Sequence, residues 1–319
     1  MDKTLIILGA GASKDFCRVF PTGLELIKDI NYHFLTEKKY PAVSKSEGIY
    51  LSALMNDIFR VFENDVELFK LIKNQLWKIQ LDYEWRNLRN EVNAPVSIDN
   101  FIATKIKEGE LIPRAADIIK YSIYYLIKGS EQAFSEGRHN HLNGNWIKEL
   151  AKKLSNYGFN DIAENLTVVT FNYDRTFEKY FPVYLNERIS LTTEQITYLQ
   201  TNVEHVYGYL GDLNEIPFEL KNNRVDIFKD KYKRIQFIGD RNKTELPRIN
   251  ADKYKQVHFI GFGYDKTNME LINIKRFTSA SFHGTAYYCT DSQIKELETE
   301  HSIYATDKLC SEYVKGLTL

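Results

Sequence analysis

The chain places small residues directly after its first apolar segment. Residues 5–8 are Leu-Ile-Ile-Leu, and they lead into Gly9, Ala10, Gly11, Ala12 and Ser13. Glycines at such a point let the backbone approach a pyrophosphate closely, and a following helix offers free N–H groups and the positive end of its dipole. The turn therefore predicts a nucleotide-binding loop. A tight strand-to-helix turn without a ligand is the alternative.

Amide and carboxylate side chains follow a second apolar run at residues 166–169. Asn172 and Asp174 come after this run, where a parallel strand ends and where open α/β sheets bind ligands. Asn172 offers both a donor and an acceptor, which can orient a water molecule or a ribose hydroxyl. Asp174 can hold an amide group, or it can simply cap the helix predicted over residues 175–180.

An imidazole and two further glycines belong to other predicted strand ends. His205 lies in the strand-like segment 203–207, and histidine is the side chain best suited to general-base catalysis near neutral pH. A structural histidine is the alternative. Gly261 and Gly263 follow a strand ending at Ile260, and they indicate close approach to a ligand or a simple turn. Three strand ends that carry glycine favour the ligand, and the set predicts a dinucleotide site.

Several common nucleotide-binding classes lack support in the sequence. Lys14 stands where G-x-G-x-x-G requires a third glycine, and no second strand ends in an acid that could hold the adenosine ribose, so a dehydrogenase is disfavoured. The GxxxxGK[ST] loop is absent. Cys17, Cys289 and Cys310 form no CxxC pair, so we expect no disulfide framework and no metal.

The bulk composition is that of a large ordered domain. The chain has 319 residues with 21 Tyr and 19 Phe, which suit a sizeable core. Its formal net charge of −1 gives no reason to expect direct nucleic-acid binding. No run approaches the ~20 apolar residues of a membrane span, so we expect a cytoplasmic protein without membrane contact.

Short, β-branched apolar runs predict a parallel sheet that a helical insertion interrupts. The predicted strands are residues 4–8, 166–170, 203–207, 234–238, 256–260 and 285–289. A capping box of Thr22 and Glu25 begins one helix. Helical spacing recurs over residues 50–81, 111–127 and 146–154, and the polar stretch 130–145 predicts a loop. The fold class is therefore α/β: a Rossmann-like domain at 1–35 and 160–319, with an inserted helical subdomain at 36–159 after the first strand and helix.

The ordered set of motifs resembles the SIR2-like family, in its prokaryotic defence-associated branch. The matching segments are residues 9–13, Pro21-Thr-Gly23, Ser97-Ile-Asp99 with Phe101, residues 170–174, His205-Val-Tyr-Gly208 and Gly261-Phe-Gly263. The resemblance implies a Rossmann-like NAD-binding domain that cleaves NAD+ into nicotinamide and ADP-ribose, to deplete NAD during phage infection. It also implies a homo-oligomer and a partner that is an ATPase or another phage-sensing protein.

The resemblance assigns a role to each candidate residue. Asn172 would position a water or the nicotinamide ribose, Asp174 would contact the nicotinamide end, and His205 would be the base acting through a ribose hydroxyl. The remaining NAD-binding residues would be Gly9, Ala10, Gly11, Ala12, Ser13 and Thr22 at the pyrophosphate, Gly261 and Gly263 toward the adenosine, and Asp99. Taken by itself, Asp99 or its neighbour Ser97 reads first as a helix cap.

Two departures from the family keep alternatives open. Tyr207 stands where the family often has its catalytic histidine, directly before the glycine, and His205 precedes it by two positions. Residues i and i+2 of a strand share a face, so we expect both side chains to enter the same cleft. A catalytically silent NAD- or ADP-ribose-binding subunit that regulates a partner is the alternative function. The paired-cysteine zinc module of protein deacetylases is missing, which leaves NAD-dependent deacylation a weaker option.

Overall fold

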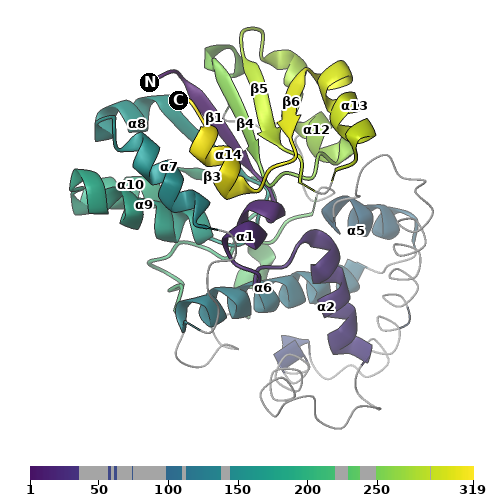
Figure 1. Cartoon of the computed structure of the whole chain (residues 1–319). Helices are drawn as coiled ribbons and strands as arrows, with labels where there is room; N and C mark the ends of the chain where they lie inside the picture. The colour runs from purple at the N-terminus through teal and green to yellow at the C-terminus, as the bar shows by residue number, and fades with distance from the viewer. Residues whose placement is uncertain are drawn as a thin grey trace.

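The protein is built around one sheet of six parallel strands, in the order β3-β2-β1-β4-β5-β6 (Figure 1). The computed structural model describes residues 1–35, 57–58, 61–62, 74, 98–109, 113–137, 144–219, 229–237, 249–287 and 289–319. The strands are β1 (Thr4–Leu8), β2 (Leu166–Thr170), β3 (Val203–His205), β4 (Gln256–Ile260), β5 (Ser281–Thr285) and β6 (Ile303–Thr306). The predicted α/β class with a Rossmann-like parallel sheet is confirmed. Strand order reverses between β1 and β4, the position at which open α/β sheets bind ligands.

Helices flank the sheet and also form a layer beyond its carboxyl edge, where α2 and α6 lie (Figure 1). The helices are α1 (Ala10–Phe16), α2 (Gly23–Leu35), α5 (Ile98–Lys107), α6 (Pro113–Ser135), α7 (Trp146–Leu154), α8 (Phe159–Asn165), α9 (Thr176–Ile189), α10 (Thr193–Thr201), α12 (Lys266–Ile272), α13 (Asp291–His301) and α14 (Cys310–Gly316). Among the residues that the structure describes, no helix is long and apolar enough to cross a membrane.

Three predicted strands, 4–8, 166–170 and 256–260, have the observed bounds, and three differ. The strand predicted at 203–207 ends at His205, and the one predicted at 285–289 is β5, four residues earlier. Residues 234–237 are not a strand: a 3-10 helix (Lys231–Arg234) leads into an extended segment whose Gln236 N–H donates to the Tyr207 carbonyl. The apolar alternation there arises because the side chains of Ile235 and Phe237 are buried, although this segment is not a strand of the sheet.

The predicted helices are confirmed where the structure describes them. The helix at 146–154 has the observed bounds, and the helix at 111–127 corresponds to α6. The loop predicted from residue 130 is wrong as far as Ser135, because α6 continues there and Ser130 Oγ donates within it to the Leu126 carbonyl. Most of the helical pattern at 50–81 lies outside the described residues.

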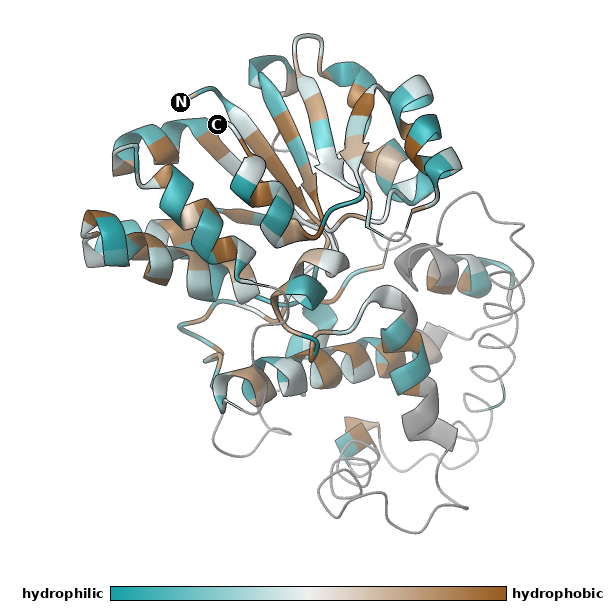
Figure 2. Cartoon of the chain, viewed as in Figure 1, coloured by the Kyte–Doolittle hydropathy of each residue, from teal (hydrophilic) through white to brown (hydrophobic). Residues whose placement is uncertain are grey.

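The central strand β1 packs through both of its faces. Leu5 and Ile7 belong to a cluster with α2, α6 and α12, here called the α6 side, and Ile6 and Leu8 to one with α7, α9 and α14, the α9 side. All five β1 residues are buried, which explains a continuous apolar run instead of an alternating one. Figure 2 shows this run along β1 and the alternation of apolar and polar residues along α6.

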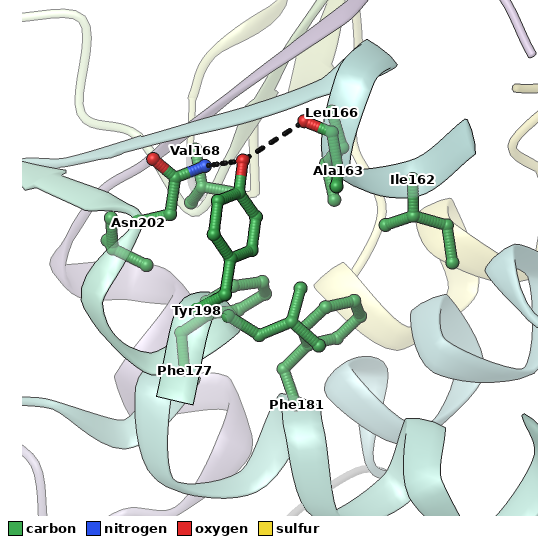
Figure 3. Close-up of a pocket in the computed structure, with 10 residues that line it drawn as sticks. Ile162, Ala163, Leu166, Val168, Phe177, Phe181, Tyr198 and Asn202 are labelled. Carbon is green, nitrogen blue, oxygen red and sulfur yellow. Dashed lines mark hydrogen bonds between the residues drawn. The ribbon is translucent and has the colours of Figure 1, made fainter. Parts of the chain in front are cut away.

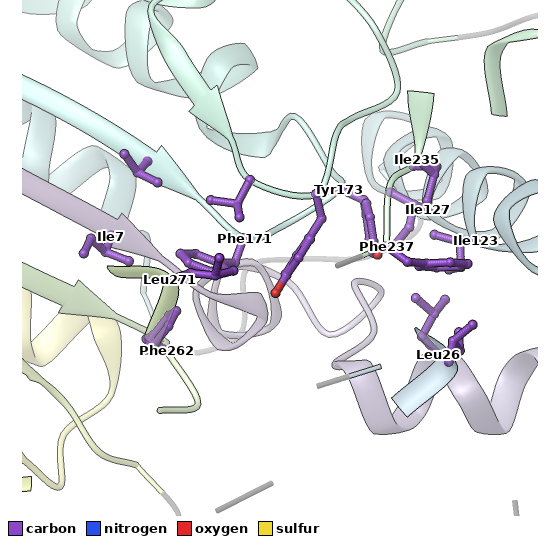
Figure 4. Packing of buried hydrophobic residues seen from close by; sticks show 14 of the residues in the cluster. Ile7, Leu26, Ile123, Ile127, Phe171, Tyr173, Ile235, Phe237, Phe262 and Leu271 are labelled. Atoms are coloured by element: carbon purple, nitrogen blue, oxygen red, sulfur yellow. The ribbon is translucent and has the colours of Figure 1, made fainter. Parts of the chain in front are cut away.

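The segment after β2 links the carboxyl edge of the sheet to the α6 layer. The Phe171 ring packs edge-on against Phe262, with ring centroids 5.0 Å apart. Figure 4 shows Tyr173 between this pair and the side chains of Ile127 and Phe237. The candidate residues Asn172 and Asp174 therefore alternate with aromatic side chains that anchor the segment in the core.

A fully buried group of charges ties α6 to the same segment. Glu131 of α6 accepts hydrogen bonds from the Arg175 guanidinium at 2.6 and 3.1 Å and from Lys128 Nζ at 2.9 Å. The Arg175 backbone N–H also donates to Glu131, and Arg175 Nη1 donates to the carbonyls of Gly211 and Ile216. Burial opposes ionisation of Glu131, but Arg175 and Lys128 outweigh it and hold the pKa of this carboxyl below its ordinary value.

Replacement of Glu131 tests how much the fold depends on this group. Glu131→Gln leaves two buried cations uncompensated, so we expect the free energy of unfolding to fall by about 3–5 kcal/mol in urea denaturation. Glu187→Gln on the exposed surface of α9, opposite Lys148, is the matched control and should cost less than about 1 kcal/mol.

The difference in unfolding free energy between wild type and Glu131→Gln should also depend on pH. Because folding lowers the Glu131 pKa, its contribution is fully present above the ordinary value of 4.5 and is lost as pH falls through the lowered value. The difference between wild type and Glu131→Gln should therefore shrink in acid. A difference that stays constant or grows would contradict this account of the charges.

Candidate functional site

The glycines after β1 and β4 bring two backbone turns into direct contact. The Gly9 N–H donates to the Ile260 carbonyl at 3.1 Å, and the Gly11 N–H donates to the Gly261 carbonyl at 2.9 Å. Gly261 has φ +60°, and a Cβ atom there would lie 1.9 Å from the Ala12 nitrogen. These three glycines are therefore required for packing at the point where strand order reverses, whatever ligand binds nearby.

A small polar cluster lies behind this contact. Asn172 Nδ2 donates to the Gly9 carbonyl and to Ser13 Oγ, both at 3.0 Å. Ser13 in turn hydrogen-bonds the Asp174 side chain, so one hydroxyl connects the amide and the carboxyl. Asn172 and Asp174 are 7% and 6% exposed. The structure thus brings together four of the predicted site residues: Gly9, Ser13, Asn172 and Asp174.

The amide oxygen of Asn172 is a buried acceptor for which the described part of the chain supplies no donor. Oδ1 has no hydrogen-bond partner among the described residues. The orientation of the amide is fixed because the Gly9 carbonyl can only accept, so the NH2 group must face it. A buried oxygen without a partner requires a donor from water or from a ligand, since leaving it unsatisfied is costly.

Asp174 combines the two roles considered from the sequence. Its Oδ1 accepts the Thr176 N–H at 3.1 Å at the start of α9, so it does support this helix. It also contacts Ser13 in the polar cluster. Burial raises the pKa of Asp174, and the hydrogen bonds from Thr176 and Ser13 offset only part of this effect. The carboxyl is therefore closer than an ordinary aspartate to accepting a proton near neutral pH.

His205 is held through both ring nitrogens. Nδ1 lies 2.9 Å from the Asn172 carbonyl oxygen, and Nε2 lies 2.5 Å from Glu178 Oε1 on α9. Its ring stacks on Tyr209, with centroids 4.6 Å apart. Sequence reasoning missed Glu178, although the helix predicted after Asp174 places it one turn further along.

Tyr207 does not share a cleft with His205. Its hydroxyl donates to Asn268 Oδ1 of α12 at 2.5 Å, and its ring packs on the α6 side beside Phe171. His205 instead turns toward α9, on the other side of the sheet. The expectation that both side chains point the same way is wrong because β3 ends at His205 and the alternation of a strand ends with it.

The remaining predicted residues lie in different surroundings. Thr22 is engaged in the predicted capping box: its N–H donates to Glu25 Oε2 at 2.8 Å and its Oγ1 accepts the Glu25 N–H at 3.4 Å. Ala10 and Ala12 lie in α1, where the Ala12 carbonyl accepts from Trp146 Nε1. Gly263 lies two residues after Gly261 and is exposed. Asp99 is in the first turn of α5, and the structure describes only its backbone.

An apolar hollow lies at the opposite ends of β2 and β3 (Figure 3). Phe177 and Phe181 of α9 line it, and the Tyr198 hydroxyl, which donates to the Ala163 carbonyl and accepts from Asn202, borders it. None of the predicted site residues lines this hollow. The candidate site is therefore defined by the polar cluster at the carboxyl edge.

Comparisons with protein-family models, with curated proteins and with solved structures find no match to this chain. The resemblance to the SIR2-like family accordingly stays a prediction from the motifs. What the structure adds is the arrangement of the candidate residues around the Asn172 amide.

The glycine contact predicts a sharp difference between two Gly→Ala variants. Gly261→Ala places a Cβ against the α1 backbone at positive φ, so we expect a loss of about 2 kcal/mol or more of unfolding free energy. At Gly129 inside α6, a Cβ atom meets none of the described residues outside its own helical turn within 4 Å, so Gly129→Ala should stabilise by about 0.5–1 kcal/mol. Equal effects of both variants in urea denaturation would show that the two turns do not pack as described.

Proposed function

We propose that the protein is an NAD+ glycohydrolase that cleaves NAD+ into nicotinamide and ADP-ribose at the carboxyl edge of β1, β2 and β4. The observation that carries the proposal is Asn172 Oδ1, which is buried beside the Gly9 turn and has no partner among the described residues. A ribose hydroxyl or a water molecule is the donor that such an oxygen requires. The motif resemblance supplies the identity of the dinucleotide.

The reaction needs a positioned water and a group that takes its proton. When the bond between nicotinamide and ribose breaks, the bonding electrons leave with nicotinamide and the ribose becomes oxocarbenium-like, as at other glycosidic centres. Water then forms the new C–O bond and releases a proton. In this proposal Asn172 orients the ribose hydroxyl or the water, and Asp174, whose pKa burial raises, accepts the proton.

His205 has no proton-transfer role in this mechanism. Both of its ring nitrogens contact protein acceptors, Asn172 O and Glu178, so neither faces a ligand. The role of base that the motif resemblance gives to His205 passes to Asp174. His205 instead supports the backbone of Asn172.

The biological setting follows from the resemblance alone. Cleavage of NAD+ during phage infection would deplete the cell of NAD and abort the infection. A homo-oligomer, or a partner that is an ATPase or another phage-sensing protein, would control when the enzyme acts.

A binding-only protein is the second candidate, and one observation favours it. The two residues nearest to the family's histidine position are both engaged: Tyr207 with Asn268, and His205 with Glu178 and Asn172. A chain in which Asp174 cannot act as base would bind NAD or ADP-ribose without turnover and regulate a partner.

Nicotinamide release from NAD+ separates these functions. We expect the full-length protein, assayed as its assembled oligomer by chromatography of products, to release nicotinamide and ADP-ribose in equal amounts. Asn172→Ala should lower kcat by about 100-fold or more, because it removes the group that orients the reactants. Asn202→Ala, at the far ends of the strands, is the matched control and should behave as wild type.

The outcomes are distinct. Release that persists in Asn172→Ala would contradict the assigned site. Tight NAD+ binding by calorimetry with no product would favour the regulatory subunit.

A further inference from the structure

We propose that Glu178 and His205 form a positioning pair, in which Glu178 orients the imidazole and the imidazole holds the backbone of Asn172. This inference rests on the proposed function for its catalytic consequence. It assigns a role to Glu178, which no motif in the sequence singled out. It also replaces the base role of His205 by a structural role at the reacting centre.

The hydrogen-bond geometry determines where the protons lie. A carbonyl oxygen can only accept, so His205 Nδ1 carries a hydrogen and donates it to Asn172 O at 2.9 Å. That leaves Nε2 for Glu178 Oε1 at 2.5 Å, and one proton lies between these two atoms. The Asn172 carbonyl thus requires the hydrogen on Nδ1, and Glu178 holds the opposite side of the ring and so fixes the orientation of the imidazole toward that carbonyl.

The surroundings keep the pair rigid. Both side chains are 5% exposed, and the His205 ring is stacked on Tyr209 with an interplanar angle of 18°. Glu178 lies between Phe177 and Phe181 in the sequence of α9, and both of these rings pack in the core of the α9 side. A long carboxylate side chain therefore has little freedom, and the imidazole that it holds has little freedom either.

Asn172 is consequently held from two directions. His205 binds its carbonyl oxygen, and Gly9 O and Ser13 Oγ bind its side-chain NH2 group. Because the backbone and the side chain of Asn172 are both held, the unpartnered Oδ1 points in one fixed direction. Glu178 reaches the reacting centre only through His205 and Asn172, so it is a positioning residue, and its loss should lower kcat more than it raises KM.

Three single substitutions in α9 test whether the positioning pair affects catalysis. Glu178→Leu should lower kcat for nicotinamide release by about 10- to 100-fold, with KM for NAD+ changed less than about threefold. Glu178→Gln can still donate from its NH2 group to Nε2, so the Nδ1 donor persists and kcat should return to within about fivefold of wild type. Glu187→Leu, on the exposed face of α9, is the matched control and should match wild type.

An NMR measurement on wild type and on the two Glu178 variants tests the positioning pair independently of activity. In the 1H–15N spectrum of the imidazole, His205 should carry a proton on Nδ1, and this signal should persist in Glu178→Gln and weaken or shift in Glu178→Leu. A bare Nδ1 in wild type overturns the proposal, and so does a Glu178→Leu enzyme with unchanged kcat.

The spectrum also separates this proposal from the proposed function. If wild type has the Nδ1 proton but releases no nicotinamide, the glycohydrolase assignment fails and the positioning pair stands. If wild type releases nicotinamide with Nδ1 bare, the pair fails and the glycohydrolase stands.

Discussion

The buried carboxylate of Glu131 is the interaction on which the placement of the candidate site depends. It binds the side chain and the backbone N–H of Arg175 and also the ammonium of Lys128. Arg175 directly follows Asp174, and its remaining donors hold the carbonyls of Gly211 and Ile216 in the segment after β3. Through Arg175, this one carboxylate therefore fixes α6, the beginning of α9 and the segment after β3 relative to each other. Such a group is costly to bury, so its members must be present together.

The glycine turn shows how packing and binding can require the same residues. Gly9, Gly11 and Gly261 are needed because the turns after β1 and β4 touch backbone to backbone. This contact places the Gly9 carbonyl where Asn172 Nδ2 can donate to it, and the amide oxygen then remains for a ligand. A packing role of the turn and a role in nucleotide binding are thus compatible. A ligand is favoured by the oxygen of Asn172, which has no partner among the described residues.

The sequence predicts best where local pattern and tertiary environment agree. β1, β2 and β4 lie in the middle of the sheet, where at least four of the five residues of each strand are buried, so their bounds could be predicted. The edge strand β6 could not be predicted, since it has four residues and its Tyr304 is 57% exposed. The strand predicted at 234–238 was wrong because Ile235 and Phe237 are buried in the cluster that contains α6, and not within the sheet.

The candidate site could be predicted only in part. Asn172, Asp174 and Ser13 follow strand ends, and the topology brings such ends together. Glu178 and Glu131 could not be found, because a charged residue in a helical pattern is usually solvated and its buried partner is far away in the chain. Arg175 and Glu131 are 44 residues apart, and His205 and Glu178 are 27 apart. The expected direction of Tyr207 failed because the strand stopped two residues before it.

A crystal structure of the full-length protein with ADP-ribose bound tests the central claim most directly. The account predicts the diphosphate at the turn after β1 and a ribose hydroxyl, or a water bound to that ribose, within hydrogen-bond distance of Asn172 Oδ1. ADP-ribose bound elsewhere, with Asn172 Oδ1 satisfied by a protein group, would contradict it.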